Sequence, residues 1–165
     1  MFGTSPIELM ASDAMLQGLI FCESFSYSSS WLTGTNSALA ASVSVDQQLQ
    51  INSDSDFVIQ EMNFVSWSAL DTIIANPDYL LNINLAGAGR NIFDSPQDIV
   101  NVCGNFASNK IPGRMPFPRL LQANSTITNT LTNRTVTASN RAKLTFRGFK
   151  IFYLTGNRQA VFHAM

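Results

Sequence analysis

Charged side chains are scarce in this sequence. Lys, Arg, Asp and Glu make up 13% of its 165 residues and leave a net charge of −1, whereas soluble domains typically carry roughly 25%. A nucleic acid is therefore disfavoured as the main partner, because binding to phosphates needs several clustered cations. The polarity comes instead from Ser, Thr, Asn and Gln. A polar but weakly charged surface has little of the repulsion that keeps proteins apart, which favours packing against other proteins.

Histidine and cysteine are also rare, and their scarcity argues against several kinds of active site. His163 is the only histidine, so a Ser–His–Asp or Cys–His arrangement would depend on it, and a cupin-like metal site needs several histidines. Cys22 and Cys103 are too few for a disulfide framework and form no Cys-X-X-Cys pair. We therefore expect two free, buried thiols, no metal, no cofactor and no catalytic residue.

Long apolar runs are missing as well. The apolar stretch around Met15 to Cys22 is far shorter than the span that crosses a bilayer. It follows Glu8 and Asp13 and has no basic leader of the kind that opens a signal peptide. We expect no membrane contact and a protein that is inside the cell when made.

Hydrophobic residues nevertheless make up 45% of the sequence, enough for one domain to bury a core. Residues 1–40 differ from the rest and are interpreted as an N-terminal arm, followed by a domain over residues 41–165. The arm opens with Ser5-Pro6-Ile7-Glu8, which matches a helix capping box with proline at the first helical position. Gly18 is placed to end this helix.

The arm is rich in aromatic side chains set among serines. Exposed aromatics are a liability in water unless they dock against protein. Two interpretations remain open: the arm docks on its own domain, or it docks on a neighbouring subunit. The predicted contact residues are Phe21, Phe25, Tyr27 and Trp31.

Beyond residue 40 the pattern is that of β-strands. Apolar and polar residues alternate over several separated segments, which predicts half-buried strands. A change of phase near Gln60 and Glu61 suggests a bulge or a strand buried on both faces, and a second apparent slip falls at Gly148, where a glycine suits a bulge. The segments are residues 43–51, 57–67, 81–85, 127–131 and 144–153.

The connections between these strands are irregular. Ser95-Pro96-Gln97-Asp98 repeats the capping pattern of a short helix, which Gly104 would end. Three prolines between Lys110 and Pro118 predict a loop or an edge strand. Separated strands with little helix predict a mainly β protein, an antiparallel β-sandwich with a partly helical N-terminal arm. The long connections favour a jelly roll within that class.

Glu61 is the most interesting acid in the sequence. It lies within an apolar strand, where burial would raise its pKa and suit it to acid catalysis. The alternative is an acid that points outward at the change of phase. No second carboxylate is identified as its partner, so the outward-pointing interpretation is preferred.

Other ligand-binding patterns are weaker. Gly87-Ala88-Gly89 lacks the third glycine of a phosphate-binding loop. The spacing of Asn91, Asp94 and Asp98 does not match a known calcium loop. Four aromatic residues are candidates for a sugar-stacking platform of a jelly-roll lectin; these are Tyr27, Trp31, Trp67 and Tyr79.

Several segments between residues 56 and 154 carry a family resemblance. They are Phe57 to Trp67, Arg114-Met115-Pro116-Phe117-Pro118, Asn124 to Ile127, Leu131-Thr132-Asn133 and the ending Leu144-Thr145-Phe146-Arg147-Gly148-Phe149-Lys150-Ile151-Phe152. In this order, the chain resembles β-sandwich virion proteins of tailed bacteriophages, and capsid decoration (cement) proteins most of all. The resemblance leaves out the N-terminal arm.

The resemblance implies a non-catalytic homo-oligomeric subunit that clamps neighbouring capsid subunits and stabilises the head lattice. Its partners would be the major capsid protein or other virion proteins. It would be located in the virion, assembled in the cytoplasm of the bacterial host. Two alternatives remain open: a head–tail completion, collar or fibre-attachment protein of the virion, and a carbohydrate-binding jelly-roll module.

Overall fold

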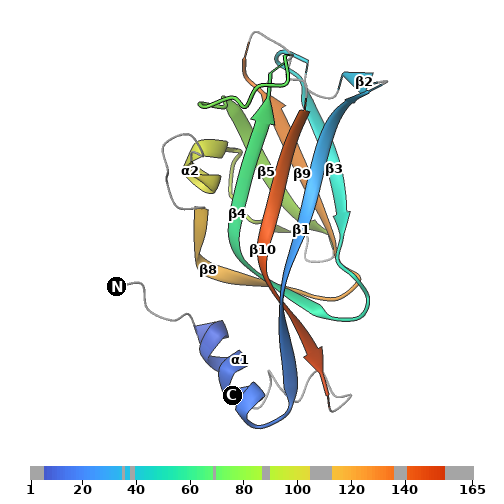
Figure 1. Ribbon diagram of the computed structural model, residues 1–165, viewed down its shortest axis with the longest axis vertical. Helices are drawn as coiled ribbons and strands as arrows, with labels where there is room; N and C mark the ends of the chain where they lie inside the picture. The colour runs from blue at the N-terminus through green and yellow to red at the C-terminus, as the bar shows by residue number, and fades with distance from the viewer. Residues whose placement is uncertain are drawn as a thin grey trace.

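The chain is mainly β and consists of two antiparallel sheets that stack as a sandwich, with a short helix at the N-terminal end (Figure 1). This confirms the predicted fold class. The computed structural model describes residues 6–34, 36–37, 40–68, 70–86, 90–104, 113–135 and 141–154.

The first sheet has the strand order β2-β1-β10-β4-β8, and the second has the order β3-β9-β5-β6, with β7 also paired to β5. The first sheet consists of β1 (Ile20–Gly34), β2 (Asn36–Ser37), β4 (Asp56–Trp67), β8 (Gly113–Leu121) and β10 (Arg141–Tyr153). The second consists of β3 (Ser44–Gln50), β5 (Tyr79–Ala86), β6 (Arg90–Asn91), β7 (Gln97–Asp98) and β9 (Thr126–Asn133). The helices are α1 (Pro6–Leu16) and α2 (Ile99–Cys103).

The strands pair as if one long hairpin were rolled into a sandwich. The outermost pair in sequence is β1 with β10, followed inward by β3 with β9, β4 with β8, and β5 with β6 and β7. Successive nested pairs alternate between the two sheets. This is the arrangement of a jelly roll, and it confirms the topology expected from the sequence.

Helix α1 forms where the capping pattern predicts it. Proline occupies its first position, and Gly18 follows its end with φ of 69°, a left-handed conformation that glycine adopts without strain. Ala11 and Ala14 are buried against the outer side of the first sheet, where they contact the cluster that contains Val58 and Ile151. The chain therefore has a second, smaller core between α1 and the sheet.

Strand β1 differs from the predicted arm. It pairs with β10 from Ile20 to Leu32 and is an integral strand of the first sheet. Its odd-numbered residues face the sandwich interior, so Tyr27 and Trp31 are 7% and 1% exposed and belong to the main core. Of the two open interpretations, the structure shows docking on the chain's own domain over this stretch, and residues 20–34 join the sandwich.

Hydrogen bonds from β1 also tie the two sheets together. The indole nitrogen of Trp31 donates to the carbonyl of Val45 at 3.2 Å. The backbone N–H of Asn52 donates to the Tyr27 hydroxyl at 3.1 Å, and the side chain of Asn129 donates to the buried Ser29 hydroxyl at 2.8 Å. Both side chains of the last pair are buried, so this bond satisfies polar groups that are removed from water.

The predicted bulge near Gln60 is confirmed. Gly148 of β10 is opposite Ile59 and Arg147 is opposite Glu61, so Gln60 is the extra residue on β4. Inward-facing positions therefore change from Phe57 and Ile59 to Met62 and Phe64.

Strand β10 itself has no extra residue, which corrects the interpretation of Gly148 as a slip in that strand. Leu144 and Phe146 face the main core, whereas Phe149, Ile151 and Tyr153 face the second core under α1. The apolar residues change parity because β10 is buried on its inner face in its first part and on its outer face, under α1, in its last part. Gly148 is required for a different reason: a Cβ atom there would lie 1.8 Å from the carbonyl oxygen of Val58.

Several smaller predictions can also be compared with the structure. Helix α2 ends before Gly104 as expected, and β8, with its prolines, is an edge strand. Both cysteines are free; Cys103 is buried and Cys22 is half-buried, and burial raises the pKa of both thiols. Among the described residues, no helix is long and apolar enough to cross a membrane.

Candidate protein-docking surface

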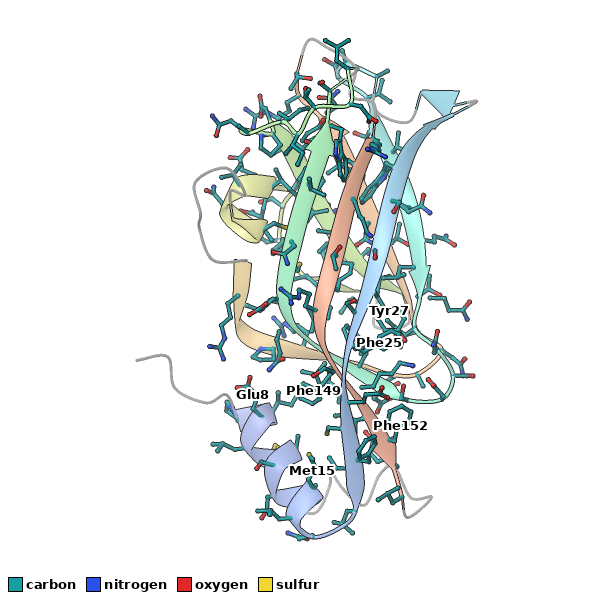
Figure 2. All side chains as sticks on the ribbon, in the orientation of Figure 1. Glu8, Met15, Phe25, Tyr27, Phe149 and Phe152 are labelled. Carbon is teal, nitrogen blue, oxygen red and sulfur yellow. The ribbon has the colours of Figure 1, made fainter. Side chains whose placement is uncertain are left out.

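Exposed apolar side chains gather at one end of the molecule, which we call the base: helix α1 and the ends of β1 and β10 that run beyond the second sheet (Figure 2). The described part of the chain has nine large hydrophobic side chains that are exposed. Three of these, Val43, Leu70 and Ile73, belong to other segments. The six in the base are Leu9, Met15, Leu16, Phe21, Phe25 and Leu154.

On the helical side of the base, two alanines and Ile7 face the sheet, while three other large apolar side chains lie outside. Ala11 and Ala14 face the sheet, whereas Leu16, Leu9 and Met15 are 86%, 57% and 43% exposed. A helix that only covered its own sheet would normally turn its largest apolar side chains inward. Exposed apolar side chains in such an arrangement are typical of a surface that contacts another protein.

The other side of the base is an aromatic cluster on the β1–β10 ribbon. The rings of Phe21 and Phe152 lie across from each other with centroids 6.0 Å apart, and Phe25 packs edge-on against Tyr27 at 4.9 Å. These residues continue the inward-facing row of the first sheet. Phe21 and Phe25 are exposed, and this end of the β1–β10 ribbon runs beyond the second sheet (Figure 1).

One ion pair lies among these rings. The ammonium group of Lys150 is 4.3 Å from the centroid of Phe25 and 5.8 Å from that of Phe152. It also donates to the carboxylate of Asp54 at 3.1 Å. The hydrogen bond from Ser55, and then that from Lys150, hold the pKa of Asp54 below its usual value. The cluster therefore combines apolar rings with one neutralised charge pair.

Of the four contact residues predicted from the sequence, two are exposed and two are buried. Phe21 and Phe25 are 51% and 36% exposed and lie in the aromatic cluster. The prediction is wrong for Tyr27 and Trp31, which are buried in the chain's own core and are not available at the surface.

Sequence reasoning missed the rest of the base. Phe152 joins the cluster only because β10 pairs with β1 beside Phe21. The signal for Leu9 and Leu16 was present in α1, whose alanines occupy the buried positions. A helix drawn with its alanines toward the core places these two leucines on the opposite side and Met15 on the flank.

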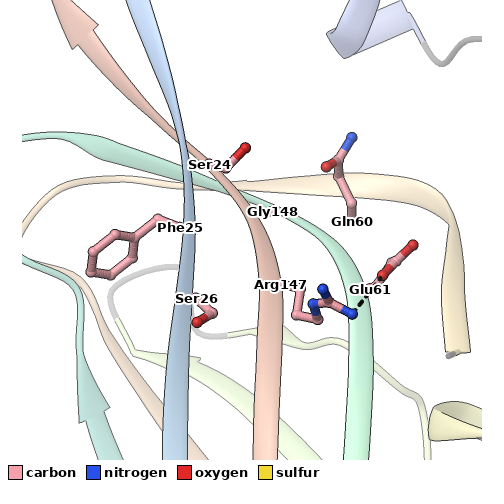
Figure 3. Close-up of a pocket in the computed structure, with 7 residues that line it drawn as sticks. All are labelled: Ser24, Phe25, Ser26, Gln60, Glu61, Arg147 and Gly148. Atoms are coloured by element: carbon pink, nitrogen blue, oxygen red, sulfur yellow. Dashed lines mark ion pairs between the residues drawn. The ribbon is translucent and has the colours of Figure 1, made fainter.

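A shallow polar depression of about 490 Å³ lies on the outer face of the first sheet, at the bulge (Figure 3). Glu61 contacts Arg147 there at 3.9 Å, and its side chain is 33% exposed. Glu61 is thus an outward-pointing acid at the bulge, as the preferred interpretation predicted. Glu61 is the only carboxylate among the described lining residues, which are Ser24, Phe25, Ser26, Gln60, Glu61, Arg147 and Gly148.

The four aromatics considered for a sugar platform do not meet on one surface. Tyr27, Trp31 and Tyr79 are buried in the main core. Trp67 is half-buried, and the guanidinium of Arg141 lies 4.5 Å from the centroid of its ring.

The remaining candidate ligands are engaged elsewhere or fall outside the described residues. Asp98 pairs with Arg134 at 2.9 Å, and Asn91 accepts a hydrogen bond from Asn84 at 2.9 Å. The described ranges contain no group of three or more His, Cys, Asp or Glu residues that could hold a metal ion. His163 and residues 87–89 lie outside the described part of the chain.

No protein-family model matches this chain, and no curated protein sequence matches it. Two solved structures show limited similarity. The ectodomain of ANX2 from Arabidopsis thaliana is 14% identical, with a TM-score of 0.33, over 78% of this chain and 33% of that chain. The VP2 subviral particle of infectious bursal disease virus is 13% identical, with a TM-score of 0.32, over 86% of this chain and 34% of that chain. This chain spans about a third of either structure, and TM-scores of this size assign it to neither family.

Proposed function

We propose that this chain is a non-catalytic structural subunit of a viral particle and that it docks on other virion proteins through its base. The observation that supports this most strongly is the exposure of large apolar side chains on both sides of the base. Leu16 on the helix and Phe21 on the ribbon are each more than half exposed. Side chains of this kind are stabilised by transfer to a protein interface.

Burial of the exposed side chains of the base supplies enough free energy for docking on an assembled particle. Fully burying one Leu or Phe side chain contributes roughly 1.5–3 kcal/mol. A few such contacts, repeated where several partner surfaces meet on a lattice, give binding that a single isolated partner would not support. The weak overall charge of the chain also leaves little repulsion to oppose close packing between subunits.

The specific role we propose is capsid decoration in a tailed bacteriophage, with the major capsid protein as partner, as the resemblance in residues 56–154 implies. The quantity that tests this role is the copy number of the chain in purified particles, measured by quantitative mass spectrometry against the major capsid protein. Hundreds of copies are expected for a lattice-wide subunit. About a dozen or fewer would instead indicate a ring at a head–tail, collar or fibre-attachment position. Absence from the particle would overturn the virion proposal.

Docking through the base is tested by point substitutions. Deletion of residues 1–40 is unsuitable, because it removes β1 together with the core residues Tyr27 and Trp31. Leu16→Ser and Leu70→Ser form a matched pair, since both leucines are 86% exposed and only Leu16 lies in the base.

We expect Leu16→Ser to reduce co-sedimentation with particles that lack the wild-type protein, and Leu70→Ser to bind like the wild type. Circular dichroism checks that both variants are folded. Equal binding by the two variants would overturn the assignment of α1 to the docking surface.

A further inference from the structure

Among the residues that the structure describes, the outer edge of β1 is a long row of backbone groups that no strand pairs. Residues 20–32 pair with β10 on one side, and β2 covers the other side only at Thr33 and Gly34. Within the described ranges, no strand pairs with the remaining edge. Free N–H and C=O groups of an edge strand form hydrogen bonds readily with another strand, so this edge is a template for strand addition.

The other sheet edges carry protection against such pairing. Strand β8 contains two prolines, and β6 and β7 have two residues each. Strand β3 carries the charge of Asp46, and its Val45 carbonyl already accepts the hydrogen bond from Trp31.

Strand β1 has 15 residues, so it lacks the protection that shortness gives to β6 and β7. It contains no proline and no basic residue, and its single charge, Glu23, lies opposite Lys150 of β10. Its outer face is formed at the centre by the small, exposed side chains of Ser24, Ser26 and Ser28. On this outer face, a second strand can therefore approach the centre of β1 without meeting a bulky or charged side chain of that strand.

We propose that this edge pairs with the same edge of a second copy of the chain, antiparallel about a two-fold axis at Ser26. A two-fold contact of this kind uses one surface twice, so each free donor finds an acceptor on the other copy. Ser26 is the midpoint of residues 20–32, and centring there pairs the whole free edge. The free edge ends at Thr33, where β1 pairs with β2.

The side chains of β1 are compatible with this register. On the outer face, Ser24 of one copy lies opposite Ser28 of the other, and hydroxyl pairs of this type stabilise neighbouring strands. On the inner face, Phe25 of one copy lies opposite Tyr27 of the other, whose side chain stays buried in its own core. The pairing of the two edges goes beyond the docking function proposed above and does not depend on it.

A charge placed on the two-fold axis tests the proposal. In Ser26→Lys, the two lysines of a dimer would be one strand spacing apart, about 5 Å. Thr145→Lys is the matched control, because Thr145 lies on the same face opposite Ser28, one strand further from the edge. Its two lysines would be three strand spacings apart across the sheet and four residues apart along it, about 20 Å in all, which exceeds the screening length of about 8 Å at physiological salt.

Sedimentation velocity of the full chain over a concentration series gives the dimer dissociation constant. We expect a dimer for the wild type, a constant at least about tenfold higher for Ser26→Lys, and little change for Thr145→Lys. A wild-type monomer at every concentration, or equal effects of the two substitutions, would overturn the proposal. Leu16→Ser, which tests the base, should leave the dimer intact.

Hydrogen exchange provides a readout that needs no variant. When the wild-type protein is diluted below its dissociation constant, amides within residues 20–32 should exchange faster, while those of the interior strand β9 should not. A dimer whose β1 amides exchange at the same rate before and after dilution uses another surface, and that result would also overturn the proposal.

Discussion

The ammonium group of Lys150 lies 4.3 Å from the ring centroid of Phe25 and at the same time donates to the carboxylate of Asp54 at 3.1 Å. Lys150 is 4% exposed, so its charge is removed from most of the water and depends on these two contacts. The ring of Phe25 faces the ammonium group, and the carboxylate of Asp54 neutralises the charge of that group. This arrangement allows a charged residue to lie within the aromatic cluster of the base.

Removing this cation should change the titration of Asp54. The pKa of Asp54 is lowered in the folded chain, first by Ser55 and then by Lys150. Its stabilising contribution is therefore present above the unfolded pKa and is lost as the pH falls through the folded pKa. In Lys150→Met, we expect the pKa of Asp54 to rise, although the bond from Ser55 keeps it below the unfolded value.

Nuclear magnetic resonance of the Asp54 carboxyl group measures this shift directly. Lys143→Met, which removes an exposed lysine from the same strand, is the control and should leave Asp54 unchanged. If Asp54 titrates identically in the wild type and in Lys150→Met, the ion pair does not form in solution.

Trp31 tests whether β1 is part of the core. Truncation of a buried large aromatic side chain costs about 3–5 kcal/mol, so we expect a loss of this size in the free energy of unfolding of Trp31→Ala. Phe21→Ala removes a ring that is 51% exposed and should cost about 1 kcal/mol or less. Urea denaturation measures both values. Losses of equal size would mean that β1 does not contribute its aromatic residues to the core.

The glycine opposite the bulge should resist substitution. The methyl group of Gly148→Ala would lie 1.8 Å from the backbone carbonyl of Val58, so one strand has to move. We expect a loss of about 1–3 kcal/mol in the free energy of unfolding, with changed amide shifts in residues 58–60. Gly18→Ala is the comparison: no atom lies within 4 Å, and only its positive φ opposes the change. Wild-type stability in Gly148→Ala would contradict the described bulge.

Tyr153 should make the protein sensitive to alkali. Burial, and then the nearby Cys22, raise the pKa of Tyr153 to about 12, and its hydroxyl donates to the buried carboxylate of Asp56 at 2.6 Å. Because the folded pKa lies above the unfolded value of 10.0, its stabilising effect is complete below pH 10 and is lost as the pH rises toward 12.

Comparison with Tyr153→Phe isolates this effect. The wild type should lose stability more steeply than Tyr153→Phe between pH 10 and pH 12, as measured by urea denaturation at each pH. Parallel pH profiles for the two proteins would show that Tyr153 ionises equally easily in the folded and unfolded chains.

Much of the local structure could be predicted because it depends on neighbouring residues. The Ser-Pro-X-Glu pattern and Gly18 bounded α1, and the change of phase at Gln60 located the bulge of β4. Strand β1 was not predicted from the sequence, although its residues follow the pattern of a strand. The four aromatic residues between Phe21 and Trp31 all occupy odd positions, and serines fill the even positions from 24 to 30, which is the period of a half-buried strand.

The sequence by itself determined which elements form and, through the alternation of apolar and polar residues, which faces they present to one another. Only the tertiary structure decided which of these faces are buried. Phe25 and Tyr27 have the same parity on the same strand, yet Phe25 is 36% exposed and Tyr27 is 7% exposed. Tyr27 is reached by the chain just beyond β3, where the backbone N–H of Asn52 donates to its hydroxyl. Burial depends on what covers a side chain, and that cover is supplied by residues distant in the sequence.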